Sequence, residues 1–191
     1  ERGVNRVLLL NDDAVLAPGS LESLNDAWED DVGALSPVIH EPGGPVYGIV
    51  VGPWGRVRLA HKPVAVQALS GACLMIRSTE RFDPVFVHGF EDIELCTRLQ
   101  RRGLRLACIV SARCEHRAGA TVSRRSRWAQ RQAVFGHLLF LRGGFRSIVV
   151  VGLALLQIIR EGGPVERLLG VWDGVMDYLK VRPLHPPHSP R

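Results

Sequence analysis

The chain has 191 residues, a formal net charge of +5, 46% hydrophobic residues and 23% charged residues. This composition is that of an ordinary globular protein and excludes a disordered chain, and the length suffices for one domain with an appendage. The four cysteines form no C-x-x-C pair, and the spacing of Cys108, Cys114 and His116 matches no usual zinc framework. We therefore expect free thiols in a reducing cytoplasm.

An apolar run near the start of the chain ends in three polar residues. Residues 7–10 predict a strand buried on both faces, as in a mostly parallel sheet. Asn11, Asp12 and Asp13 follow at its carboxyl end, where open α/β sheets bind ligands. Their oxygens suit a hard divalent cation, Mg²⁺ or Mn²⁺, which usually serves a phosphate. The alternative is an Asx-type turn that needs no metal.

Helices and strands then alternate along the chain. Residues 21–27 predict a helix with Ser20 as its N-cap, and a short strand follows at residues 32–36. Residues 41–56 are rich in Gly and Pro and predict hairpin-like loops. Two further strands are predicted at residues 64–66 and 72–76. This interruption of strands by helices indicates an α/β fold.

A second acidic cluster opens the next predicted helix. Glu91, Asp92 and Glu94 lie within four residues at its start, and Gly103 is a typical helix stop. The backbone N–H groups and the dipole at the amino end of a helix favour negative charge there. The cluster could equally be an ordinary acidic first turn.

Another predicted strand, residues 106–110, is followed closely by Glu115 and His116. The neutral imidazole of a histidine after a strand is a candidate metal ligand, although a lone histidine is more often a surface or hydrogen-bonded residue.

The last third of the chain predicts helices over residues 127–141, 148–159 and 165–181, and then a disordered Pro-rich tail, residues 183–191. Residues 148–159 are apolar except for Gln157, but a membrane span needs about 20 residues. We expect a buried or interfacial helix there.

Positive charge is concentrated in this helical part. Arg124, Arg125, Arg127 and Arg131 surround Trp128, a mixture that is common at lipid headgroups. We expect these basic helices to make a peripheral membrane contact, with a solvated basic helix face as the alternative. No nucleic-acid motif of defined spacing is present, so we expect no nucleic-acid partner.

The order of these motifs resembles the family 2 glycosyltransferases of the GT-A fold, most closely the rhamnosyltransferase and galactofuranosyltransferase-like branch. The resemblance covers residues 4–125. It is carried by the strand, Asn-Asp-Asp and Pro-Gly of residues 7–19, by Leu-Ser-Gly-Ala-Cys-Leu-Met-Ile-Arg at 69–77, by Phe-Glu-Asp-Ile-Glu-Leu-Cys-Thr-Arg at 90–98 and by Glu-His-Arg-Ala-Gly-Ala-Thr at 115–121.

The resemblance implies a partial GT-A domain in residues 1–122, with a Rossmann-like mixed sheet and flanking helices that hold the metal and acceptor side. A helical appendage, residues 123–182, and a disordered tail, residues 183–191, would follow. The family's amino-terminal half, with its nucleotide-base pocket, has no counterpart here, so we expect a fragment or one part of a split protein.

The resemblance also assigns roles to the first polar cluster. Asp13 would bind a divalent cation, Mn²⁺ or Mg²⁺, and Asn11 and His116 would complete the metal site. Asn11 and Asp12 would also lie against the donor, with Asp12 adding charge or reaching its ribose.

Four further residues match the donor and catalytic positions of the family. Gly71 and Ala72 would line the donor sugar, where a larger side chain would block access. Asp92 would be the catalytic base, with Glu91 as its neighbour. A single base without a carboxylate nucleophile is the arrangement expected for inversion at the anomeric carbon.

The implied activity is transfer of a sugar from a UDP- or dTDP-sugar to a cell-surface glycan or lipid-linked acceptor, in the cytoplasm at the inner face of the plasma membrane. Two departures from the family pattern concern the acceptor loop, of which only residues 82–84 remain, and Glu94, which replaces Asp. Two other functions are open: a catalytically silent remnant that binds a membrane or a partner, and a metal-dependent phosphohydrolase that uses the same acids.

Overall fold

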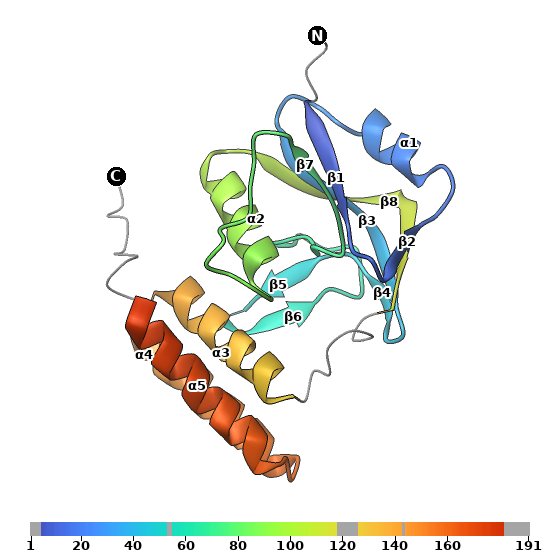
Figure 1. Ribbon diagram of the computed structural model, residues 1–191. Coiled ribbons are helices and arrows are strands. Elements are labelled where there is room, and N and C mark those ends of the chain that lie inside the picture. Colours follow the sequence, from blue (N-terminus) through green and yellow to red (C-terminus); the bar gives the residue numbers. More distant parts are fainter. Residues whose placement is uncertain (1–4, 53–54, 118–125, 143, 182–191) are drawn as a thin grey trace. The chain divides into compact units, whose positions relative to one another are not determined.

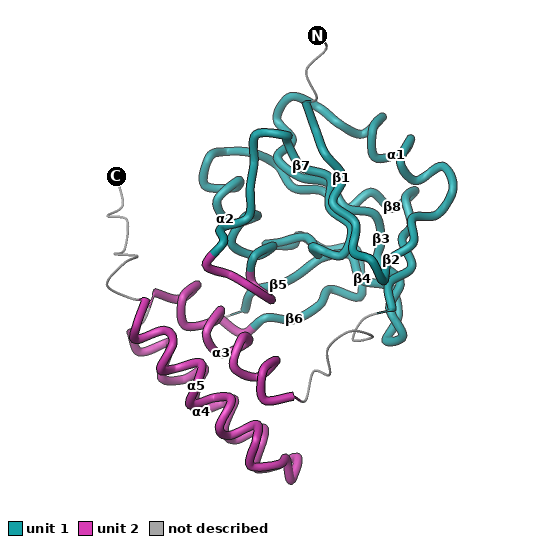
Figure 2. The backbone as a smooth tube through the Cα atoms, viewed as in Figure 1, with its two compact units in different colours: residues 1–52, 57–84, 91–120 teal, residues 53–56, 85–90, 121–191 magenta. Residues whose placement is uncertain are grey.

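The computed structural model describes residues 5–52, 55–117, 126–142 and 144–181. The chain forms two compact units (Figure 2). Unit 1 comprises residues 1–52, 57–84 and 91–120, and unit 2 comprises residues 53–56, 85–90 and 121–191.

Unit 1 is built on a mixed β-sheet with two helices (Figure 1). Its strands are β1 (Arg6–Leu10), β2 (Ala14–Leu16), β3 (Val32–Glu41), β4 (Gly44–Val46), β5 (Ile49–Val51), β6 (Val57–Leu59), β7 (Cys73–Arg77) and β8 (Arg105–His116), and its helices are α1 (Ser20–Asp26) and α2 (Glu91–Arg101). The predicted α/β class with a mixed sheet and carboxyl-terminal helices is confirmed.

The large sheet has the strand order β1-β7-β3-β8-β2, with β4 paired to β3, and β5 and β6 form a separate hairpin. Of the pairings between described strands, only β3 with β8 is parallel. The prediction of a mostly parallel sheet was therefore wrong. A parallel pair needs a long crossover, and the connection from β3 to β8, which contains α2, provides one.

The first strand is only half buried. Among the described residues β1 pairs with β7 alone and lies at one end of the sheet order, and Leu10 is 45% exposed. The prediction of a strand buried on both faces was therefore wrong, because a four-residue apolar run does not reveal how many neighbours the strand has.

The core of unit 1 lies on the sheet and beneath both helices. One cluster packs Leu24 of α1 against buried side chains of the sheet, and α2 buries its own apolar positions. The first cluster is Leu24, Val32, Leu35, Met75 and Ala112; the buried side chains of α2 are Ile93, Leu95, Cys96 and Leu99. Gly103, at φ +81°, follows α2 and confirms the predicted helix stop.

Two local predictions were wrong. Gly19, not Ser20, is the N-cap of α1, because the Ser20 hydroxyl donates to the Arg113 carbonyl and accepts from the Arg113 N–H. Residues 64–66 are irregular and not a strand. After Pro63, the chain meets β5 at the isolated bridge between Ile49 and Ala68 and through Gln67, whose Oε1 accepts from the Val51 N–H at 2.9 Å.

Unit 2 contains three helices, α3 (Arg127–Leu141), α4 (Phe145–Arg160) and α5 (Val165–Val181), which confirm the three predicted helices. Glycines let α5 approach α3 closely. A Cβ atom on Gly170 or Gly174 would lie 2.5 or 2.6 Å from the carbonyl oxygen of Arg127 or Arg131. The core is formed by Val134, Phe135, Leu138, Ile158, Val171 and Tyr178.

Ion pairs also join α3 to α5. Arg127 donates to Asp173 at 2.7 Å, and Arg131 donates to Asp177. Two arginines of the predicted basic cluster thus already have acidic partners, and Arg124 and Arg125 lie outside the described residues. The predicted tail, residues 183–191, also lies outside them.

The loop that precedes α2 in the chain ends in a strained residue. Phe90 has a φ of 72°, which is unusual for a bulky side chain. Its ring lies 4.2 Å from that of His137 and packs on Gly136, within unit 2. Among the described helices, none has the length and apolar character needed to cross a bilayer.

The close approach of α5 to α3 predicts that a larger residue at Gly174 destabilises the folded chain. Gly174→Ala should lower the free energy of unfolding by about 1–3 kcal/mol, because its methyl group would overlap a backbone oxygen that cannot move freely. Urea unfolding followed by circular dichroism measures this change.

Gly152→Ala is the matched control, because nothing lies within 4 Å of its Cβ position. It should raise the free energy of unfolding by up to about 1 kcal/mol through helix propensity alone. Equal effects of the two substitutions would contradict the packing of α5 on α3 described above.

Candidate active site

The turn between β1 and β2 carries Asn11, Asp12 and Asp13 and is fixed at both ends by backbone hydrogen bonds. The Asn11 N–H donates to the Ala72 carbonyl at 3.0 Å, and the Arg117 N–H donates to the Asp13 carbonyl at 3.0 Å. One end of the turn is thereby fixed beside the start of β7 and the other beside the end of β8. Asn11 and Asp12 are exposed, and Asp13 is partly buried.

His116 lies next to Asp13 because of strand register. Ala14 of β2 pairs with His116 of β8, so the residue before Ala14 reaches the same point. The His116 Nε2 lies 3.2 Å from the Asp13 Oδ1, and the His116 Nδ1 lies 3.1 Å from the Glu41 Oε1. All three side chains are largely buried, and the imidazole is held between two carboxylates.

The spacing of the Asp13 carboxylate and the His116 imidazole fits that of two ligands of one divalent cation. Two neighbouring ligands of an octahedral Mg²⁺ or Mn²⁺, each about 2.1 Å from the ion, are about 3 Å apart, close to the separation of Asp13 and His116. In the tautomer whose Nδ1–H donates to Glu41, the Nε2 lone pair is directed toward Asp13 and is available to a metal ion. Carboxylate–histidine pairs orient metal ligands in this way.

The protein supplies few ligands at this point. Within the described residues, no group of three or more His, Cys, Asp or Glu side chains is placed to hold an ion. A cation here would take most of its ligands from water and phosphate, as Mg²⁺ usually does in nucleotide sites.

Asp92 lies at the start of α2 and accepts two backbone hydrogen bonds. The Gly71 N–H donates to its Oδ2 at 2.9 Å, and the Ile93 N–H donates to its Oδ1 at 2.8 Å. Burial, and then the charge of Glu91, raise the pKa of Asp92 to about 6, although the two N–H groups act in the opposite direction. A carboxyl group with this pKa is mostly ionised at neutral pH and is still a fair base.

Two consecutive residues connect the parts of the site. Gly71 donates to Asp92, and the carbonyl of Ala72 accepts from Asn11. A Cβ atom on Gly71 would lie 3.4 Å from the Cβ of Asp92. Contacts therefore join Asp92 to Gly71 and Asn11 to Ala72 around the segment that leads into β7, and Asp13 to His116 at the end of β8. Asp12 and Glu91 are their neighbours in the chain, and the roles of all eight predicted residues stay predictions.

The position of α2 is fixed by a buried acid. Glu80 is 5% exposed and accepts from Arg98 at 3.1 Å and from Arg102 at 2.6 Å. Glu94 pairs with Arg98 within the helix at 3.1 Å. Glu94 thus lies in an intact helix.

Sequence reasoning missed Glu41, the second partner of His116. It lies 75 residues away in the chain, in a Pro- and Gly-rich segment that matches no motif. No signal in a single sequence marks it.

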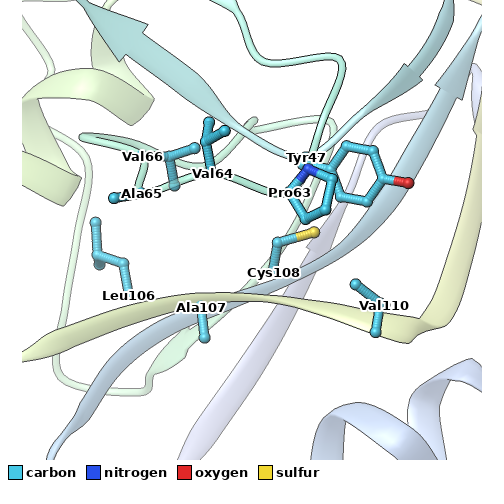
Figure 3. A pocket seen from close by; sticks show the side chains of 9 residues that line it. All are labelled: Tyr47, Pro63, Val64, Ala65, Val66, Leu106, Ala107, Cys108 and Val110. Atoms are coloured by element: carbon cyan, nitrogen blue, oxygen red, sulfur yellow. The ribbon is translucent and has the colours of Figure 1, made fainter.

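A pocket of about 290 Å³ lies elsewhere in unit 1, between residues 63–66 and strand β8 (Figure 3). Its lining is apolar except for the Tyr47 hydroxyl and the thiol of Cys108, whose pKa is raised by burial. None of the predicted site residues lines it. All four cysteines are free, as predicted.

Comparison with known proteins supports a distant relationship to glycosyltransferases. The sequence matches no protein-family model. It is 30% identical, over 150 residues, to N-acetylglucosaminyl-diphospho-decaprenol L-rhamnosyltransferase from two strains of Mycobacterium tuberculosis, CDC 1551/Oshkosh and ATCC 25618/H37Rv. The match covers 62% of this chain and 48% of each relative, so the chain spans about half the length of the curated relatives it matches.

The raised pKa of Asp92 predicts how stability depends on pH. A carboxyl whose pKa is higher in the folded state contributes stability below its ordinary pKa, and that contribution is lost as the pH rises through about 6. Between pH 4 and pH 8 the stability of Asp92→Asn should therefore rise relative to that of the wild type by about 2–3 kcal/mol, at 1.36 kcal/mol per pKa unit. The variant also loses one acceptor for the Gly71 or Ile93 N–H, and this cost is the same at every pH.

Urea unfolding at pH 4, 6 and 8 measures this difference. The pH series is its own control, because only the ionisation of Asp92 makes the difference between the variant and the wild type depend on pH. A gap that stays constant from pH 4 to pH 8 would contradict the burial of an ionisable Asp92.

Proposed function

We propose that this chain is part of a metal-dependent, inverting glycosyltransferase that uses a nucleoside-diphosphate sugar as donor. The observation that carries the proposal is the arrangement of the Asn11–Asp13 turn, His116 and Asp92 around Gly71 and Ala72 in one unit. The distant homology to a rhamnosyltransferase supports the same reaction class.

Asp13 and His116, with Asn11 beside them, would hold Mn²⁺ or Mg²⁺. A bound cation would neutralise the charge that develops on the departing nucleoside diphosphate. Glu41 would keep the imidazole in the orientation that directs Nε2 toward the ion. Asn11 and Asp12, which are exposed, would face the donor.

Asp92 would remove the proton from the acceptor hydroxyl as that oxygen attacks the anomeric carbon. Its pKa of about 6 leaves it ionised at neutral pH, and burial, followed by the charge of Glu91, makes it a stronger base than an ordinary aspartate. General base catalysis of this kind contributes about 10²–10⁴-fold in rate. Gly71, whose missing side chain would point at Asp92, would leave room for the donor sugar next to this base.

For the acceptor, we propose a lipid-linked sugar or a growing cell-surface glycan. The relative from M. tuberculosis is named for a diphospho-decaprenol acceptor, and a lipid-linked acceptor would require this chain to work at the inner face of the plasma membrane. Peripheral contact of the carboxyl-terminal helices with that membrane fits this location, and we propose no nucleic-acid partner.

Metal-dependent nucleotide binding tests the proposal. By isothermal titration calorimetry, the chain should bind UDP or dTDP more tightly with Mn²⁺ than with EDTA. Asp13→Asn should reduce this metal-dependent affinity by about 10–100-fold, the usual effect of disturbing a metal site. Asp92→Asn should leave it unchanged, because a base for the acceptor hydroxyl does not hold the donor.

Glu41→Gln and Glu115→Gln form a matched pair, since each removes one negative charge near His116 but only Glu41 contacts the ring. Only Glu41→Gln should weaken Mn²⁺-dependent binding. Equal loss in both variants would contradict the role of Glu41. No metal-dependent binding by the wild type would favour a silent remnant, and nucleoside-diphosphate release without an acceptor would favour a phosphohydrolase.

A further inference from the structure

Helix α4 is apolar on two opposite faces. Its inner face contributes Ile158, which is 1% exposed, to the core of unit 2, and Val151, Ala154 and Leu155 pack against that core. Val150 is also buried, at 8% exposed. A helix that is apolar all round is normally either buried on every side or in contact with lipid. Because α4 is buried on one side only, its outer side needs an explanation.

The outer side carries a continuous row of large apolar residues, here called the outer stripe: Ile148, Leu153, Leu156 and Ile159. Ile148 and Ile159 are 70% and 68% exposed, and both leucines are about half exposed. Ile148, Leu156 and Ile159 lie at helical spacing on one line of the surface, with Gly152 between the first two. Isolated surface apolar residues are common, but a stripe along a whole helix marks an interaction surface.

The charged residues of α4 and of the segment just before it are all positive. Arg142, Arg146 and Arg160 flank the outer stripe and are exposed, and residues 142–160 contain no Asp or Glu. The first acid beyond the helix, Glu161, accepts from Arg167 at 2.7 Å. The arginines predicted from the sequence to meet lipid behave differently, because Arg127 and Arg131 are paired with acids of α5.

These charges favour an anionic lipid surface over a second copy of the chain as the partner of the outer stripe. In a two-fold dimer through the outer stripe, the arginines of one copy would face those of the other. An anionic bilayer would instead place lipid phosphates opposite the arginines and acyl chains opposite the stripe. Helix α5 also exposes apolar residues, but it carries Glu166, Asp173 and Asp177.

We infer that α4 lies flat in the interface of an anionic membrane, with the outer stripe among the acyl chains and its arginines among the headgroups. With 16 residues at about 1.5 Å each, α4 is about 24 Å long and too short to cross the hydrocarbon core. The surface contact is independent of any sugar transfer. That it brings the chain to a lipid-linked acceptor rests on the proposed function.

Sedimentation with lipid vesicles tests this inference on the full chain, without donor, acceptor or metal. The wild type should bind vesicles of phosphatidylglycerol and phosphatidylcholine, and should bind vesicles of phosphatidylcholine alone at least about tenfold more weakly. Ile148→Glu should lower binding to the anionic vesicles by at least about tenfold, because it places a negative charge within the outer stripe.

Val87→Glu is the matched control, since Val87 belongs to unit 2 and is 71% exposed but lies outside α4. It should bind almost as the wild type does, and circular dichroism checks that both variants are folded. Equal binding by the two variants, or no preference of the wild type for anionic lipid, would overturn the inference. The inference would also be overturned if light scattering showed that the wild type is a dimer and that Ile148→Glu is a monomer. Nucleotide binding is measured without vesicles, so failure of the proposed function is seen separately.

Discussion

The candidate site depends on one short antiparallel pairing, that of β2 with the end of β8. The register that opposes Ala14 to His116 brings the carboxylate of Asp13 to the imidazole. Because side chains alternate across a strand, a slip of one residue in β2 or β8 would turn one of these groups to the other face of the sheet. The bond from the Asn11 N–H to the Ala72 carbonyl then joins this turn to the segment that contacts Asp92.

Two opposing effects set the chemistry at Asp92. Its hydrogen bonds from Gly71 and Ile93 stabilise the carboxylate, while burial and the charge of Glu91 disfavour it. Burial and the charge of Glu91 have the larger effect, so Asp92 is a stronger base than an exposed aspartate. It is still ionised at neutral pH. Glu80 is buried and accepts from Arg98 of α2 and from Arg102 just after it, and these ion pairs hold the helix that carries Asp92 in place.

Much of this arrangement could be predicted from the sequence, because it follows from local patterns. An apolar run followed by Asn11 and Asp13 predicts a polar turn at a strand end, and three helices are marked by helical spacing and glycine breaks. Strand direction, the bond of Ser20 to Arg113 and the contact of Glu41 with His116 were not predictable. They depend on residues far apart in the chain, whose meeting is decided by packing and not by local preference.

A crystal structure of the chain with Mn²⁺ and UDP or dTDP would test the central claim most directly. Anomalous scattering should place manganese between the Asp13 carboxylate and the His116 Nε2, with the diphosphate completing its ligands and Asp92 facing the same space. Manganese bound away from these two side chains, or a nucleotide bound on another face of unit 1, would contradict the account.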